Sequence, residues 1–240
     1  MTNALSNLLI AKTATRSKPS SLDLRGLKDL VRGGETDILE FKLKAAHPEK
    51  IVREIVAFAN TKGGILLVGV GDDRKIQGLK FADEDEYLLV RAIEQLCTPA
   101  IAYEVERIFV SNDREVLLFR IAKSFQKPHF AIIDASKDTR KAFVRIADRS
   151  VQASKEVRQI LKWENTIQNI SFKYGPKEET LIKYLDQHPS ITLAMYAQVA
   201  GIPMWLASKT LITMVLANVI KIVPDEIADK YTALDQQSPR

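Results

Sequence analysis

The chain has 240 residues, of which 46% are hydrophobic and 27% are charged, and its formal net charge is +5. A chain of this length and composition can bury a sizeable core, and no apolar run approaches the roughly 20 residues of a transmembrane helix. The single cysteine, Cys97, excludes an internal disulfide and a multi-cysteine zinc site. Its helical spacing from Ile93 predicts a buried thiol, and the chain shows no secretory signal pattern, so a reducing, cytoplasmic location is expected.

Taken in chain order, the first elements predict a mixed α/β domain over residues 21–170, after a flexible arm over residues 1–20 that is rich in Ser, Thr and Lys. The spacing of the hydrophobic residues and the positions of Gly and Pro predict four elements. These are a helix that ends at Gly33 and Gly34, a strand over 38–42, a helix that begins at Pro48 and a buried strand over 65–70. The remaining elements are a helix over 84–97, strands near 103–110, 115–122 and 141–146, and a helix with Ser154 as its N-cap.

The Gly-Pro pair in residues 171–176 predicts a linker, and after it the sequence shows mainly the hydrophobic spacing of helices. Residues 177–240 predict helices over 177–187, 192–199 and 203–217, followed by two short strands at 220–223 and 230–234. Three helices followed by a hairpin is the order of a winged helix. The expected fold is therefore α/β, with a mixed sheet in the first domain and a small winged-helix domain at the C-terminus.

Two common kinds of site do not fit the sequence. No Walker A string occurs, and Gly69 and Gly71 are followed by acidic residues, which would repel the phosphates that a glycine loop binds. The three histidines, His47, His129 and His188, are scattered and share no ligand spacing, so structural or surface roles are expected for them.

Acidic residues mark the first candidate site. Glu35 and Glu40 bracket the strand over 38–42, and Asp72 follows the buried strand over 65–70. If these strands are neighbours, the three carboxylates could form a hard-oxygen site for Mg²⁺ or Mn²⁺ that aligns water and phosphate, with Lys42 holding a phosphate. The alternative is a solvated strand edge followed by an ordinary Asp turn.

Basic residues mark the second candidate site. Lys137, Arg140, Lys141, Arg145 and Arg149 are clustered, and on a strand over 141–146 one face carries Lys141, Phe143 and Arg145. A basic face with an aromatic side chain suits a phosphate-tracking surface, and the alternative is a charged edge that prevents aggregation.

The third predicted helix of the C-terminal domain offers Lys209, Ser208 and Thr210 to nucleic acid, and the rest of it is mainly apolar. The supposed wing, "PDEIAD", is acidic and would be repelled by a phosphate backbone. Met204 and Trp205 near the start of this helix suggest a dimer interface as the competing role.

The strings "ETDILEFK", "EIVAFANTKGGILLVGVGDDRKIQGL", "KPHF" and "FVRIADRSVQAS" occur in the order seen in the Schlafen-type (Alba-like) DNA-binding domain, which was formerly called a divergent AAA domain. The resemblance covers about residues 30–165. In the Schlafen nucleases of that group three acidic residues cut tRNA and rRNA with a divalent metal. Matched motif by motif, those acids fall on Glu35, Glu40 and Asp72, with Asp73 as a competing match for the third.

Three functions are therefore open. The leading prediction is a nucleic-acid-binding protein, specifically a transcriptional regulator of bacterial type. Its partner would be DNA, or RNA. It is expected to form a homo-oligomer and not to bind a membrane. The second is an endoribonuclease that uses Mg²⁺ or Mn²⁺ at Glu35, Glu40 and Asp72. The third is a protein-interaction module whose winged helix dimerises.

Overall fold

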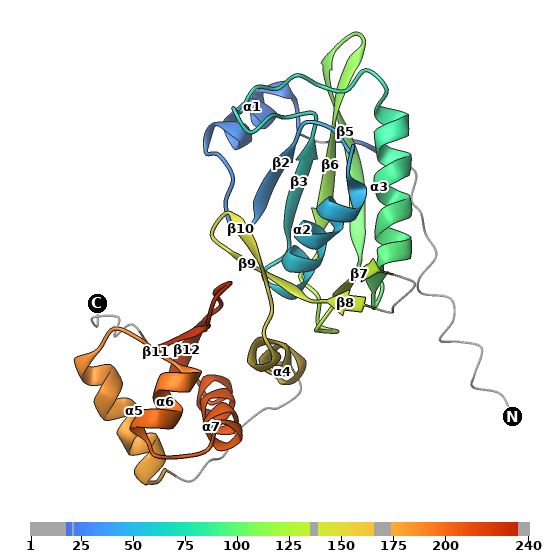
Figure 1. The fold of residues 1–240 in the computed structure, drawn as a ribbon. Coiled ribbons are helices and arrows are strands. Elements are labelled where there is room, and N and C mark those ends of the chain that lie inside the picture. The colour runs from blue at the N-terminus through green and yellow to red at the C-terminus, as the bar shows by residue number, and fades with distance from the viewer. Residues whose placement is uncertain (1–17, 21, 135–138, 166–173, 235–240) are drawn as a thin grey trace, which may run out of the picture. The chain divides into compact units, whose positions relative to one another are not determined.

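The computed structural model describes residues 18–20, 22–134, 139–165 and 174–234 (Figure 1). Most of the predicted arm over residues 1–20 therefore lies outside the described residues. Contacts divide the chain into two units: one runs to Ser124 and resumes over His129–Ser150, and the other contains Phe125–Pro128 and the chain from Val151 onwards.

A five-stranded sheet organises the first unit, in the order β1-β5-β6-β3-β2. β2 and β3 are parallel neighbours, as the predicted metal site requires, with Glu40 opposite Leu66. β3 pairs antiparallel with β6, and the β5–β6 hairpin forms where the sequence predicts it. The strands are β1 (Lys18–Pro19), β2 (Leu39–Lys42), β3 (Gly64–Val68), β5 (Tyr103–Ser111) and β6 (Arg114–Ile121).

Helices cover both faces of this sheet (Figure 1). α1 (Leu24–Arg32) packs Leu27 and Val31 against one face, where Leu39, Phe41 and Leu67 are buried. α2 (Pro48–Asn60) and α3 (Ala82–Leu96) cover the other face. Because side chains alternate along a strand, Glu40 faces α2 while its neighbours Leu39 and Phe41 face α1.

Gly63, after α2, has a φ of +79°, and a Cβ there would lie 2.7 Å from the carbonyl oxygen of Ile121. Only glycine fits this close approach of two backbones, which lets the chain reverse from α2 directly into β3.

Shorter strands complete this unit. β4 (Cys97–Thr98), β7 (Phe130–Asp134) and β8 (Thr139–Lys141) form one sheet. β9 (Phe143–Ile146) pairs with β10 (Arg149–Gln152) and runs beside α2. The single strand expected over residues 141–146 is therefore two strands in two sheets, which separate at Ala142.

The described residues of the second unit form four helices and a small sheet. α4 (Lys155–Trp163) packs on α7, although its place in the sequence predicts that it belongs to the first domain. The sheet has the order β11-β13-β12, and its pairs are antiparallel. Leu181, Tyr196, Leu211 and Tyr231 form the core. The other elements are α5 (Pro176–Gln187), β11 (Ile191–Thr192), α6 (Leu193–Val199), α7 (Met204–Leu216), β12 (Ile220–Val223) and β13 (Lys230–Ala233).

Among the described helices, none is by itself long and apolar enough to cross a membrane. α6 and α7 are long and apolar enough only when they are taken together, and the chain bends by 111° between them.

Candidate functional site

Glu35 lies in the turn before β2 and folds back onto that strand. Its Oε1 accepts a hydrogen bond of 2.8 Å from the backbone N–H of Phe41. The backbone N–H of Thr36 donates to the carbonyl oxygen of Leu39, so two bonds hold this turn against β2. Gly34, with a φ of +79°, permits the turn.

Glu40 is buried, with 5% of its surface exposed, and both of its carboxylate oxygens are paired with cations. The Lys42 ammonium pairs with Oε1, and Nη2 of Arg145 lies 2.5 Å from Oε2. The Lys42 side chain is 30% exposed and covers one side of the pair. Glu40 is therefore part of an internal ion-pair network under α2.

Arg145 is the centre of this network, and only 1% of its side chain is exposed. Its Nη1 lies 2.6 Å from Oε2 of Glu54, and its Nη2 also donates to the carbonyl oxygen of Thr36 at 3.0 Å. Its guanidinium stacks 5.0 Å from the centre of the Phe58 ring. The planar fork of arginine suits such a site, because several acceptors can be satisfied at once.

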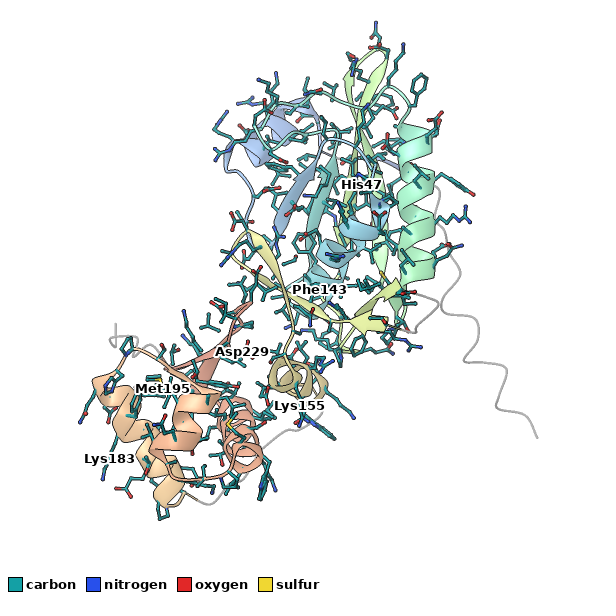
Figure 2. The ribbon with its side chains drawn as sticks, in the orientation of Figure 1. His47, Phe143, Lys155, Lys183, Met195 and Asp229 are labelled. Atoms are coloured by element: carbon teal, nitrogen blue, oxygen red, sulfur yellow. The ribbon has the colours of Figure 1, made fainter. Side chains whose placement is uncertain are left out.

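The expectation that Arg145 belongs to an exposed basic face is wrong. Phe143, which lies on β9 beside α2 (Figure 2), is also buried, at 7% exposure. The physical reason is that α2 covers β9, so the side of the strand that carries Phe143 and Arg145 points into the unit rather than to solvent. Arg145 positions carboxylates and cannot contact a phosphate from this location.

The other basic residues of the second candidate site differ in exposure. Arg140 and Arg149 are exposed, and Lys141 is half-buried. Lys137 lies outside the described residues. Lys209 is exposed on α7 in the second unit. Arg140, Lys141 and Arg149 therefore remain as described candidates for phosphate contact in the first unit.

Asp72 is exposed and close enough to Glu35 to influence its titration. Burial is the main cause that raises the pKa of Glu35 above its ordinary value, and the charges of Glu40 and Asp72 raise it further. The charges of the three predicted acids therefore act on one another through Glu35. Within the described ranges, however, no group of three or more His, Cys, Asp or Glu side chains is arranged to hold a metal ion. Asp73, the competing match, pairs instead with Lys75.

Cys97 and the histidines occupy structural or surface positions, as expected. Cys97 is buried, and burial raises the pKa of its thiol to about 12. His129 is 1% exposed, and its ring bonds to the carbonyl oxygen of Pro99 and the hydroxyl of Ser124. His47 lies at the start of α2 in Figure 2, near Glu49, and His188 stacks on Tyr184 at the end of α5.

Sequence reasoning missed two residues of α2. Glu54 holds Arg145 and also bonds the hydroxyl of Ser150, and burial raises its pKa. Arg53 is exposed and lies with its guanidinium 5.8 Å from the centre of the Phe143 ring. Both fall on polar positions of an amphipathic helix, and only the packing of β9 against α2 distinguishes them from solvated surface residues.

Two comparisons with known proteins give matches. A crystal structure of the DIP2311 protein from Corynebacterium diphtheriae is similar at 20% sequence identity and a TM-score of 0.34. The match covers 50% of this chain and 26% of that one, so this chain matches about a quarter of the length of that protein. Residues 35–154, which contain Glu35, Glu40, Asp72 and Arg145, match the profile of the Schlafen, AlbA_2 family. The chain therefore belongs to the Schlafen, AlbA_2 family.

Proposed function

We propose that this protein binds nucleic acid without cutting it, as a DNA-binding transcriptional regulator. The observation that carries the proposal is the pairing of both Glu40 oxygens with the chain's own cations, Lys42 and Arg145. A divalent cation at this carboxylate would have to displace them. Displacing Arg145 would leave a buried guanidinium with fewer partners, and breaking such a buried pair costs about 3–5 kcal/mol.

Nucleic acid would contact the exposed cations of the first unit. Arg140 and Arg149 are exposed there, Lys141 is half-buried, and Lys137 lies between β7 and β8 along the chain. Arg53 adds a guanidinium beside β9. Separate lysines and arginines on short strands contact phosphates in a largely sequence-independent way, so salt dependence is the property to measure.

The second unit supports a winged helix as part of the same proposal. The order α5, β11, α6, α7, β12, β13 and the three-stranded antiparallel sheet support this assignment. Its predicted reading helix, α7, begins with Met204 and Trp205, which are 49% and 68% exposed. Apolar side chains there favour contact between protomers over hydrogen bonds to base edges. We therefore assign oligomerisation to α7 and phosphate contact to the first unit.

A fluorescence-anisotropy titration of duplex DNA and of an RNA hairpin over a range of salt tests this function. If Lys137, Arg140, Lys141 and Arg149 each contact one phosphate, the logarithm of the association constant should fall with the logarithm of the salt concentration with a slope of roughly −3 to −4. Arg140→Ala with Arg149→Ala should flatten the slope by about two. Arg91→Ala with Lys123→Ala removes the same charge from other exposed positions of the unit and should leave the slope unchanged. Equal effects of the two pairs would remove the β8–β10 region from the interface.

A metal-dependent endoribonuclease is the second candidate, and one observation favours it. The charges of Glu40 and Asp72 both raise the pKa of Glu35, so the three acids of the family pattern are coupled electrostatically. The residues that would hold Mg²⁺ or Mn²⁺ are therefore Glu35, Glu40 and Asp72, and the ion would activate water for phosphodiester cleavage.

Incubation of tRNA with millimolar Mn²⁺ or with a chelator decides between the two functions. We expect binding without cleavage, and no rise in melting temperature with Mn²⁺. Cleavage that requires Mn²⁺ and is lost in Glu40→Gln, while RNA binding persists, would establish the nuclease instead.

A further inference from the structure

A hollow of about 490 Å³ lies on the first unit, between the N-terminal half of α3 and the β5–β6 hairpin. The guanidinium of Arg107 bonds there to Asp83 at 2.6 Å, Glu86 at 2.5 Å and Glu115 at 3.2 Å. Three carboxylates around one guanidinium leave this surface with an excess of negative charge. It would repel a phosphate backbone, so the proposed nucleic-acid binding does not explain it.

Exposed aromatic side chains border the same hollow. Tyr87 is 62% exposed and Phe109 is 65% exposed, and both line it. Phe81, which is 61% exposed, lines an adjoining hollow of about 360 Å³ that shares Asp83 and Arg107. Large aromatic side chains gathered on a surface mark a contact with another segment or molecule. The matching segment would carry apolar residues and basic residues and no acids.

Residues 1–17 have that composition and lead directly to the hollow. Their apolar run contains Leu8, Leu9 and Ile10, their charged residues are Lys12 and Arg16, and they include no Asp or Glu. Pro19, at the end of β1, lines the hollow itself. β1 is fixed at the sheet edge by pairing with β5 and by the 2.8 Å ion pair of Lys18 with Glu104. The segment is therefore tethered at the wall of the surface that it complements.

We propose that residues 1–17 dock in this hollow of their own chain. Their apolar residues cover Tyr87 and Phe109, while Lys12 and Arg16 lie near the carboxylates that surround Arg107. Reach does not limit the contact, because 17 residues can extend to about 56 Å and α3 is about 22 Å long. The tether also supplies an effective concentration in the millimolar range, so that weak contacts are sufficient.

The test uses quenching of a bimane dye by a tryptophan in the full-length chain. Cys97 is buried and its thiol pKa is raised to about 12, so a cysteine introduced as Thr13→Cys can be labelled selectively. Tyr87→Trp places the quencher in the hollow at an exposed position. Ile38→Trp is the matched control, because Ile38 is 48% exposed next to β2, at the opposite edge of the sheet from β1. Trp163 and Trp205 are present in both proteins.

We expect stronger quenching with Tyr87→Trp than with Ile38→Trp, independent of protein concentration. Lys12→Glu with Arg16→Glu should lower the ratio of docked to free segment by about tenfold, since two surface charge pairs become repulsive. Equal quenching from the two tryptophans would overturn the proposal. Quenching that grows with protein concentration would also overturn it, because the occupant would then be the segment of a second copy.

Discussion

Arg145 is the residue on which the candidate site depends. It is almost fully buried, yet it joins β9 to Glu40 of β2 and to Glu54 of α2. Buried ion pairs of this kind add little net stability compared with apolar packing, but they are costly to break from one side. Arg145 therefore holds the carboxylates of Glu40 and Glu54 in place instead of binding a ligand at the surface.

Replacing Arg145 with methionine should destabilise the protein by about 3–5 kcal/mol, because Glu40 would remain buried after losing one of its two cationic partners. Urea unfolding measures the change. Glu40→Gln in the same chain should restore part of the loss, since a neutral amide has no charge to compensate. Arg149→Met is the control, and as an exposed substitution it should change stability by no more than about 0.5 kcal/mol. Equal costs at the two positions would contradict the buried network.

The pKa of Glu35 can be used to test whether Glu35, Glu40 and Asp72 lie close together. Burial raises its pKa, and Glu40 and Asp72 add to the rise. Asp72→Asn should therefore lower the pKa of Glu35, measured from its side-chain carboxyl signal by ¹³C NMR, while Asp148→Asn at another exposed position should not. An unchanged Glu35 titration in Asp72→Asn would place Asp72 outside the site.

The raised pKa of Glu35 also fixes the sign of its effect on stability. The folded state binds this proton more tightly than the unfolded state, whose glutamate pKa is about 4.3. The contribution of Glu35 to stability is therefore complete below that pH and is lost as the pH rises through the folded-state pKa. The difference in unfolding free energy between wild type and Glu35→Gln should fall across this window.

At the scale of elements, α4 shows how local capping and tertiary contact combine. The Ser154 hydroxyl accepts from the backbone N–H of Val157 at 3.1 Å, as an N-cap should, and also donates to Asp229 at 2.5 Å. Asp229 and the first residue of α4, Lys155, are both labelled in Figure 2. Glu156, in the first turn of α4, accepts from the Ser208 hydroxyl of α7 at 2.6 Å. Two side-chain contacts thus bond the start of α4 to the rest of the second unit.

Ser154→Ala should cost about 2 kcal/mol, because it removes both a helix cap and the partner of a half-buried carboxylate. Thr192→Ala removes the corresponding cap of α6, which accepts from the N–H of Met195 at 3.3 Å, and should cost about 1 kcal/mol. Thermal unfolding of the two variants compares them. If Ser154→Ala costs no more than Thr192→Ala, the bond to Asp229 adds nothing.

At the scale of the whole molecule, the separation of functions between the two units can be tested with one substitution. Trp205→Asp places a charge at an exposed position of α7. It should reduce the oligomeric mass seen by sedimentation velocity, while the salt slope of DNA binding stays that of the first unit. Phe125→Asp adds the same charge at a residue that is 77% exposed and should leave the mass unchanged. A lost salt slope in Trp205→Asp would make α7 the DNA-binding element.

Much of the local structure follows from short-range patterns in the sequence. Pro48 opens α2, Ser154 caps α4, and the β5–β6 hairpin forms where its turn residues predict it. These signals work because they act between residues a few positions apart. The resemblance of the strings to the family likewise predicts, from the sequence alone, that Glu35, Glu40 and Asp72 form one group.

The environment of those acids was decided only by tertiary structure. Periodicity placed Arg145 and Phe143 on one side of a strand but could not say that α2 covers that side. Glu54 and Arg145 are 91 residues apart in the chain, and no local pattern joins them. The sequence by itself thus determined the helices and strands β2, β3, β5 and β6, and the family resemblance singled out the three acids. Which charges face solvent and which neutralise each other inside depended on long-range packing, because burial and pairing are properties of neighbours in space.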